Sequence, residues 1–356
     1  TDDAVTLNVT DSGADAINAQ TISTTDFETM TLDTSGKGAA VAQTLGTVTM
    51  AASLGGTTTF IVKGDNSIDT SGVITAGTID FSGVTAAAGV TMGAAAASVT
   101  SITGSAGTDT LTGDASSTID GGAGNDIITG GTSHDTLTGG AGNDTITTNT
   151  GNDTVDAGDG NDTVNMDSGL SNKDVIKGGL GSDTLRIDAA ATAATASGVS
   201  GFETFSADTA MTQDMAVFAS NGTFTSLDVN VAGTVTFSNV GTAVTSLYNT
   251  TTGGTAVVTR LVDGSANSLS VYAQDTTSGN EGVTTFAKIT ASDEETLSLV
   301  SGSNAGEDLT LTDLASTDLK TINASGTADV KITNAITLAT DLATVDASGL
   351  SGALEV

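Results

Sequence analysis

The segment from Gly121 to Arg186 carries glycine and aspartate at a fixed spacing that suits the binding of a divalent cation. One nine-residue unit recurs there, as GGAGNDIIT, GGTSHDTLT, GGAGNDTIT, TNTGNDTVD, AGDGNDTVN and, after an interruption, GGLGSDTLR. Glycine at the first, second and fourth places permits turns with positive φ and close approach of the backbone. Aspartate at the sixth place offers a carboxylate, and Ca²⁺ takes carboxylate and carbonyl oxygens at about 2.3–2.6 Å. The sequence therefore predicts that this segment holds several calcium ions.

The elements that must position these carboxylates are short strands, because the eighth place of each unit is apolar. Two units complete one coil of a parallel β-roll, so aspartates eighteen residues apart lie on the same flank of adjacent coils. We predict a first row made of Asp126, Asp144 and Asp162, and a second row made of Asp135 and Asp153. The predicted inward residues are Leu111, Ile119, Ile128, Leu137, Ile146, Val155, Val164, Ile176 and Leu185.

These rows are electrostatically unfavourable without a metal ion. Strands of adjacent coils lie about 4.8 Å apart. Two carboxylates at that distance repel each other by about 1 kcal/mol in water and by several kcal/mol at an effective dielectric constant of about 20. We therefore expect this segment to be unfolded without Ca²⁺ and folded with it.

The pattern is irregular at both ends of the segment. Residues Gly104–Asp109 form a fair copy of the turn, but the next copy is one residue short and has Thr118 where aspartate is expected. This makes the pairing of Asp109 with Asp126 irregular. A three-residue insertion between Asn165 and Gly178 is expected to shift Asp174 and Asp183 out of the two rows.

The segment resembles the RTX family, the repeats-in-toxin proteins that Gram-negative bacteria export by type I secretion. The resemblance implies that the sixth-place aspartates of one unit and of the unit after next share one Ca²⁺ with turn carbonyls. The best pairs would be Asp126 with Asp144, Asp144 with Asp162, and Asp135 with Asp153. The implied metal-site residues are Asp109, Gly121, Gly122, Gly124, Asp126, Gly130, Gly131, Asp135, Gly139, Gly140, Gly142, Asp144, Gly151, Asp153, Gly158, Gly160, Asp162, Asp174, Gly178, Gly179, Gly181 and Asp183.

Composition excludes several classes of function. The 356 residues include 9 basic and 42 acidic ones, for a net charge of −33, so the chain is not expected to bind nucleic acid or anionic lipid. Without cysteine it has neither disulfides nor cysteine-based zinc sites.

The single histidine, His134, lies at the fifth place of a unit and is expected to be solvated. No serine or threonine has a readable catalytic partner, so we predict no enzyme. The apolar stretch Ala86–Val99 is too polar to be a transmembrane segment.

The sequence on both sides of the repeats also predicts β-structure. Leu319–Gly326 matches Leu342–Gly349 at an offset of 23 residues, and Phe286–Asp293 is a weaker copy. A period in the low twenties with two apolar positions is typical of one β-solenoid coil. We predict an all-β chain, an elongated parallel β-solenoid containing an RTX calcium β-roll, with little helix; β-sandwich modules are the alternative. The predicted segments are 1–100 (solenoid-like), 101–187 (calcium β-roll) and 188–356 (solenoid-like).

Acidic clusters outside the repeats have two interpretations. Asp2-Asp3, Asp293-Glu294-Glu295 and Glu307-Asp308 are either solvated turns or further calcium sites.

Three functions are compatible with calcium repeats inside β-rich sequence: a surface-layer subunit, an RTX adhesin or biofilm protein, and the secretion module of an exoprotein. A secretion module should follow a catalytic domain, and an adhesin should show long tandem copies of one domain. The acidic, cysteine-free sequence, with Gly178–Ile187 followed by Gly201–Phe205, is similar to calcium-dependent surface-layer proteins of Gram-negative bacteria. That resemblance implies an extracellular location, self-association in a lattice, and contact with outer-membrane lipopolysaccharide through segments outside this sequence. We interpret the chain as a fragment, because it lacks an initiator methionine and ends in a predicted strand.

Overall fold

The structure is a computed structural model of the chain. It describes residues 3–8, 18–35, 43–51, 57–70, 72–87, 89–93, 95–114, 116–167, 169–220, 224–250, 253–260, 267–273, 284–292, 294–302, 307–334, 336–338 and 342–356. Contacts divide the chain into two compact units. Unit 1 comprises Thr1–Asp167 and Lys173–Asp183, and unit 2 comprises Ser168–Asn172 and Thr184–Val356. The three segments predicted from the sequence do not coincide with these units and remain a prediction.

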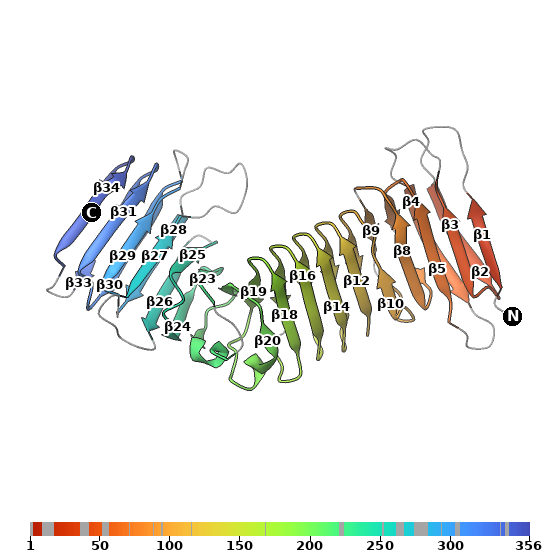
Figure 1. Cartoon of the computed structure of the whole chain (residues 1–356), viewed down its shortest axis with the longest axis horizontal. Helices are drawn as coiled ribbons and strands as arrows, with labels where there is room; N and C mark the ends of the chain where they lie inside the picture. The colour runs from red at the N-terminus through yellow and green to blue at the C-terminus, as the bar shows by residue number, and fades with distance from the viewer. Residues whose placement is uncertain are drawn as a thin grey trace. The chain divides into compact units, whose positions relative to one another are not determined.

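Unit 1 is a parallel β-solenoid with two sheets (Figure 1). One sheet contains β1 (Ala4–Asn8), β3 (Thr29–Asp33), β5 (Thr59–Gly64), β8 (Thr78–Val84), β10 (Ser101–Thr103), β12 (Thr118–Ala123), β14 (Thr136–Ala141), β16 (Thr154–Asp159) and β18 (Val175–Leu180). The other contains β2 (Asn18–Thr25), β4 (Gln43–Ala51), β6 (Ile68–Thr70), β7 (Ile74–Thr75), β9 (Val90–Met92), β11 (Thr110–Thr112), β13 (Ile127–Thr129), β15 (Thr145–Thr147) and β17 (Thr163–Met166).

Unit 2 is built in the same way. One sheet contains β19 (Thr184–Ile187), β21 (Thr204–Ala207), β23 (Ser226–Val229), β25 (Ser246–Asn249), β27 (Ser268–Tyr272), β29 (Thr296–Val300), β31 (Thr321–Gly326) and β34 (Thr344–Leu350). The other contains β22 (Thr212–Asp214), β24 (Thr234–Val240), β26 (Gly254–Arg260), β28 (Thr284–Ala291), β30 (Leu309–Ser316), β32 (Val330–Ile332), β33 (Ile336–Leu338) and β35 (Leu354–Glu355). The remaining elements are β20 (Val199–Ser200) and the short 3₁₀ helices η1 (Thr195–Gly198) and η2 (Met215–Phe218).

The predicted all-β solenoid is confirmed. Strand pairings are parallel throughout the described part of both units, as between β12 and β14 or between β29 and β31. Antiparallel hairpins, which β-sandwich modules need, do not occur among these residues. Helix is limited to η1 and η2 within the described residues.

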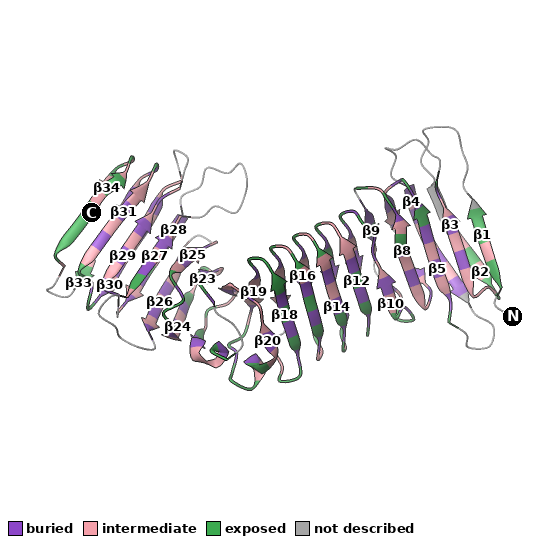
Figure 2. Cartoon of the chain, in the orientation of Figure 1, coloured by how far each residue is buried: buried purple, intermediate pink, exposed green. Residues whose placement is uncertain are grey.

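The core of the roll is a stack of the eighth-place residues, all of which lie in unit 1 except Leu185, in unit 2. Ile119 pairs with Leu137 in one sheet, and Ile128 pairs with Ile146 in the other, so two nine-residue units make one coil. Figure 2 shows the alternation of buried and exposed positions along these strands. The predicted inward residues, all fully buried, are Leu111, Ile119, Ile128, Leu137, Ile146, Val155, Val164, Ile176 and Leu185.

The prediction of a looser repeat in unit 2 was only partly correct. The offset of 23 residues is confirmed, because Thr321 pairs with Thr344 and Ile322 with Val345. The weaker copy was wrong, because Phe286 lies in the other sheet and pairs with Leu311. Both sheets of a coil alternate small polar and apolar residues, so the pattern alone did not distinguish them. Asp293, at the end of that copy, lies outside the described residues.

Candidate calcium-binding site

The sixth-place aspartates of the first row are joined by hydrogen bonds from coil to coil. The backbone N–H of Asp126 donates to Oδ1 of Asp144 at 2.7 Å, and that of Asp144 donates to Oδ1 of Asp162 at 2.8 Å. The same bond continues at both ends, from Asp109 to Asp126 and from Asp162 to Asp183, each at 2.8 Å. One carboxylate oxygen of each acceptor therefore fixes the neighbouring turn.

The second row has the same ladder with a different first member. Asp135 N–H donates to Oδ1 of Asp153, and Asp153 N–H donates to Oδ1 of Asp174, both at 2.9 Å. At the start of the row, Ser117 N–H donates to Oδ1 of Asp135 at 2.7 Å. Ser117 thus occupies the sixth place, where Thr118 was expected. Thr118 is the first residue of β12 and pairs with Thr136.

The insertion after Asn165 does not displace the aspartates that follow it. Asp174 and Asp183 keep the ladder bonds at 2.9 and 2.8 Å, so the expected shift was wrong. The strand register also continues, since Val155 pairs with Ile176 and Gly158 with Gly179. The extra residues are taken up between strands, where chain length does not affect the pairing.

Burial makes these carboxylates costly to ionise in the absence of a cation. The sixth-place aspartates are at most 5% exposed. Burial raises the pKa of Asp126 to about 7 and that of Asp153 to about 6, and neighbouring carboxylates add to both increases. None of the ion pairs in the described part of the chain involves Asp126, Asp144 or Asp162. Burial also raises the pKa of Asp109, Asp135, Asp144 and Asp162.

The second carboxylate oxygen of the first row fits a divalent cation. Oδ2 of Asp126, Asp144 and Asp162 is buried and accepts no hydrogen bond from the described residues. A Cβ atom added to Gly121 would lie 2.5 Å from Oδ2 of Asp126 and 2.6 Å from the carbonyl oxygen of Gly139 in the next coil. Glycine therefore keeps open a space on which a carboxylate and a carbonyl oxygen converge, which is the donor set that Ca²⁺ prefers.

This donor set differs from a cluster of acidic side chains. The described residues contain no group of three or more His, Cys, Asp or Glu side chains that could hold a metal ion. Backbone carbonyls must therefore supply much of the coordination. In the second row, Oδ2 of Asp135 also accepts a hydrogen bond from Gly131 N–H at 2.7 Å. The two rows thus differ, because Oδ2 accepts no hydrogen bond from described residues in the first row but accepts one at Asp135 in the second.

A second ladder, at the fifth place, was not predicted. Asn143 N–H donates to Oδ1 of Asn125, and Asn161 N–H donates to Oδ1 of Asn143, both at 2.8 Å. In the other row His134 takes this position, and its Nδ1 accepts from Asn152 N–H at 3.2 Å. His134 is exposed, as expected, but it also stabilises a turn. The recurrence of asparagine at the fifth place was the signal that could have shown this.

The predicted positive φ is found at most glycines of the second and fourth places, but not at Gly131 or at the first-place glycines. Gly140 has φ 114°, and a Cβ atom there would collide with the carbonyl oxygen of Gly122. We expect Gly140→Ala to destabilise the calcium-loaded roll by about 1–3 kcal/mol, the usual cost of such backbone strain. Thermal unfolding with excess calcium measures this. Gly241→Ala is the control, because a Cβ atom at Gly241 meets nothing within 4 Å. Equal changes for the two variants would contradict the assigned role of Gly140.

The acidic clusters outside the roll are engaged by basic or polar groups of the chain. Glu294 lies 2.6 Å from Nε of Arg260, and both side chains are buried. Oε2 of Glu295 accepts from Asn267 N–H at 2.7 Å, and Asp308 lies 2.9 Å from Nζ of Lys331. Further calcium at Glu294 or Asp308 is therefore not supported. Asp2 lies outside the described residues.

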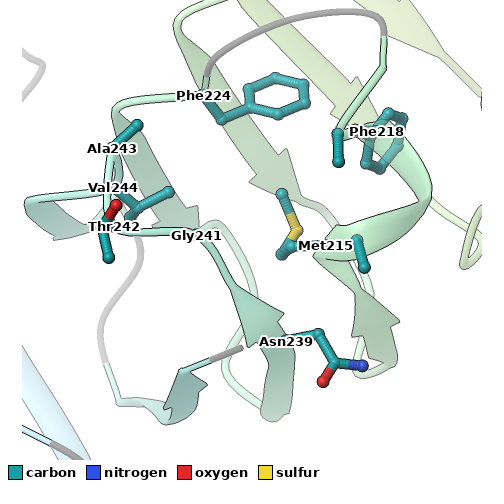
Figure 3. Close-up of a pocket in the computed structure, with 10 residues that line it drawn as sticks. Met215, Phe218, Phe224, Asn239, Gly241, Thr242, Ala243 and Val244 are labelled. Atoms are coloured by element: carbon teal, nitrogen blue, oxygen red, sulfur yellow. The ribbon is translucent and has the colours of Figure 1, made fainter. Parts of the chain in front are cut away.

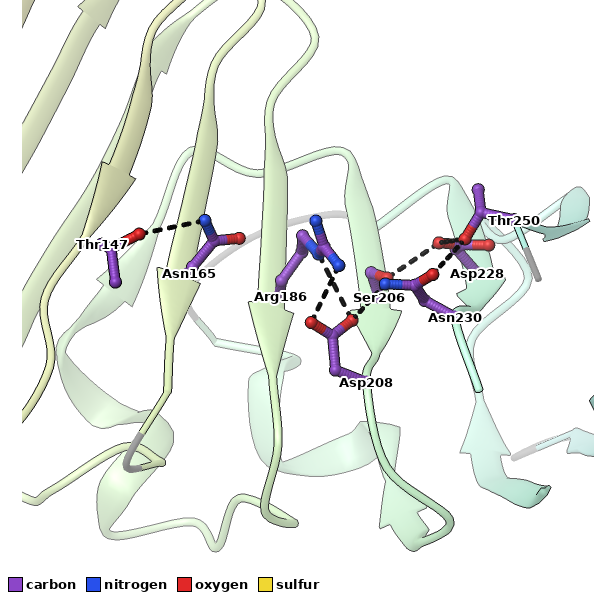
Figure 4. A network of polar contacts seen from close by, with 8 residues as sticks. All are labelled: Thr147, Asn165, Arg186, Ser206, Asp208, Asp228, Asn230 and Thr250. Carbon is purple, nitrogen blue, oxygen red and sulfur yellow. Dashed lines mark hydrogen bonds and ion pairs between the residues drawn. The ribbon is translucent and has the colours of Figure 1, made fainter. Parts of the chain in front are cut away.

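Unit 2 also neutralises a polar network with an arginine (Figure 4). Nη2 of Arg186 lies 2.9 Å from Oδ2 of Asp208, and Asn230 donates to Oδ1 of Asp208 at 2.8 Å. Asp228 accepts from the hydroxyl groups of Ser206 and Thr250 at 2.8 and 3.1 Å. In unit 2 an arginine side chain thus supplies the positive charge that pairs with a carboxylate. In unit 1 the aspartates of the first row form no ion pair with any described residue.

Comparison with known families agrees with this site. The model of the RTX calcium-binding nonapeptide repeat matches residues 101–116, 114–146, 129–164, 138–171 and 168–186. The chain therefore contains RTX calcium-binding repeats, folded as a β-roll within a parallel β-solenoid. Such repeats bind several Ca²⁺ ions, so calcium is the metal of this site. The RTX β-roll is generally a structural fold. No curated protein matches the chain.

Among the described residues, no helix is long and apolar enough to cross a membrane.

Proposed function

We propose that this chain is a structural subunit of a two-dimensional bacterial surface layer that folds and assembles on extracellular Ca²⁺. The observation that carries the proposal is the first row of buried carboxylates, Asp126, Asp144 and Asp162, none of which forms an ion pair with a described residue. This row lies inside solenoid sequence that continues on both sides. An acidic scaffold of this kind requires a divalent cation for compact folding. A repetitive solenoid with no readable catalytic group suits a structural role.

Calcium concentration would control where the chain folds. In a calcium-poor cytoplasm, the stacked carboxylates repel and the chain stays unfolded, which suits type I export. Outside the cell, each site that is loaded at about a hundred times its Kd stabilises the folded state by about 2.7 kcal/mol. Several sites therefore favour folding strongly after secretion.

In this proposal the ladder and the metal use different oxygens of one carboxylate. Oδ1 of Asp144 holds the backbone of Asp126, and Oδ2 of Asp144 is left for the ion. The carbonyl of Ala157 faces the same space beside Gly139. We expect the other sixth-place aspartates to bind calcium through their carboxylates in the same way, together with the carbonyl oxygens of the first-place residues.

Asp144→Ala is expected to weaken calcium binding more than Asp135→Ala. Asp144 lies between Asp126 and Asp162 and serves two proposed ions, whereas Asp135 begins its row next to Ser117, which has no carboxylate. Losing a shared ligand should lower the affinity of two sites by at least about tenfold, which is the smallest effect typical of even indirect metal contacts. Titration calorimetry measures the number and affinity of ions. The exposed Asp156→Ala is the control, and equal losses for Asp144 and Asp135 would contradict the rows.

Electron microscopy of the purified chain with calcium, and again after chelation, tests the layer itself. Ordered sheets that disappear with chelator are expected. Folded single particles that never tile would contradict the proposal and favour an adhesin. At a net charge of −33, copies repel each other, so calcium is also expected to bridge acidic surfaces between copies.

A further inference from the structure

Unit 2 contains a buried carboxyl group, that of Asp228, which is only half satisfied by hydrogen bonds. Asp228 is 7% exposed and lies on β23, between Ser206 of β21 and Tyr248 of β25. Its Oδ2 accepts from the hydroxyl groups of Ser206 and Thr250 at 2.8 and 3.1 Å. Its Oδ1 is buried and accepts no hydrogen bond from the described residues. One oxygen of this carboxyl group is thus without a donor (Figure 4).

The positive charge of this network is engaged by another carboxylate. Nη2 of Arg186 lies 2.9 Å from Oδ2 of Asp208, and its Nε donates to Oδ1 of Asp208 at 3.3 Å. None of the ion pairs in the described part of the chain includes Asp228. Burial raises the pKa of Asp228 more than the hydroxyl groups and the charge of Arg186 lower it.

The other titratable groups around Asp228 supply no second cation. On β19, β21, β23 and β25 and at their C-terminal ends, all within the described chain, Arg186 is the only basic residue. Asp188 and Asp208, which directly follow β19 and β21, are acidic. Tyr248, which pairs in register with Asp228, contributes a phenol. An ionised Asp228 therefore adds a further negative charge to an acidic cluster.

The pocket of unit 2 does not hydrate this carboxyl group. This pocket of about 240 Å³ lies between η2 and the turn after β24 (Figure 3). Met215, Phe218 and Val244 are among its lining residues, none of which is titratable, and Asp228 is not one of them. Packing thus keeps water from Asp228, and a buried carboxylate without full compensation is costly.

We propose that Asp228 carries a proton in the folded state of unit 2, and that loss of this proton at rising pH weakens the stacking of β21, β23 and β25. Hydroxyl groups accept as well as donate hydrogen bonds, so Ser206 and Thr250 can hold a protonated carboxyl group as well as an ionised one. Because the pKa of Asp228 is higher in the folded state than in an unfolded chain, this contribution to stability is complete below the unfolded-state pKa. It is lost as pH rises through the folded-state pKa.

Asp228→Asn tests the proposal, because the amide has nearly the shape of the carboxyl group and does not ionise. Thermal unfolding of both chains is measured with excess calcium from about pH 4 to about pH 8, a range that begins near the pKa of an exposed aspartate. Both chains carry the same calcium roll, so titration of its aspartates cancels in the difference between their Tm values. The Tm of unit 2 in the variant should rise relative to the wild type as pH increases. A difference that stays constant over this range would overturn the proposal.

Carboxyl carbon-13 chemical shifts of the wild-type chain give a second test that does not depend on the stability of a variant. The resonance that is missing from Asp228→Asn identifies Asp228, and its titration midpoint should lie above about 3.9, the ordinary value of an aspartate. Ser206→Ala removes a hydrogen bond that lowers the pKa of Asp228, so it should move this midpoint to higher pH. A wild-type midpoint at or below the ordinary value would show that Asp228 is ionised and would contradict the proposal.

Discussion

Chelation of calcium is expected to unfold the roll of unit 1 and to leave unit 2 folded. In unit 1 the buried carboxylates of Asp126, Asp144 and Asp162 stack on one another, and none forms an ion pair within the described part of the chain. In unit 2 the buried Glu294 is neutralised by Arg260. Each lost site removes about 2.7 kcal/mol at calcium levels a hundred times Kd. Because 1 kcal/mol shifts the Tm of such a unit by about 2–4 °C, loss of several sites should lower it by more than about 10 °C.

Differential scanning calorimetry with calcium and with chelator measures this difference. Two transitions are expected, of which only one responds to calcium, and limited proteolysis with mass spectrometry assigns each transition to its unit. Magnesium is the control cation, because it retains its waters and demands a stricter octahedral geometry, so it should restore less stability. If both transitions shift together, or if neither shifts, the prediction that only unit 1 depends on calcium for its stability is wrong.

Arg260→Ala is expected to destabilise unit 2 by about 3–5 kcal/mol, because it leaves Glu294 as an uncompensated buried charge. The two side chains are only 2% and 1% exposed, so solvent does not screen them. Arg260 also donates to the carbonyl oxygens of Gly241 and Val244, in the turn between β24 and β25, and of Ser268, at the start of β27. Its removal therefore leaves both a charge and several carbonyls without their donor.

Urea unfolding of the calcium-loaded chain measures the effect of Arg260→Ala. The double variant Arg260→Leu with Glu294→Leu is the control, because replacing a whole buried pair by apolar residues is often close to neutral. A loss below about 1 kcal/mol for the single variant, or an equal loss for the double variant, would show that this ion pair does not brace unit 2.

The roll could be predicted from the sequence because its repeat is local and strictly phased. Glycine, aspartate and the apolar eighth place recur every nine residues, so strand register, core and rows follow from spacing alone. The errors arose where spacing changes. A deletion moved the sixth place to Ser117, and the insertion after Asn165 left Asp174 and Asp183 in the ladder because the turn absorbed it.

Unit 2 was less predictable because its decisive contacts are distant in sequence. Arg260 and Glu294 are 34 residues apart, and no local pattern links them. The four-membered cluster of Phe205, Phe218, Phe224 and Phe237 likewise joins residues of β21, η2, the segment before β23, and β24, which no local pattern links. Coils of unequal length make that assignment ambiguous, as the misplaced repeat at Phe286 demonstrates.

The most direct test of the calcium rows is a crystal structure of the chain grown with Ca²⁺, with anomalous scattering used to locate the ions. The first row predicts anomalous peaks beside Oδ2 of Asp126, Asp144 and Asp162. The peaks at Asp126 and Asp144 should lie within the spaces that Gly121 and Gly139 keep open. Ca–O distances of about 2.3–2.6 Å to these carboxylates and to turn carbonyls are expected. A calcium-loaded crystal with ions only at surface acidic residues, and none along the first row, would contradict this account.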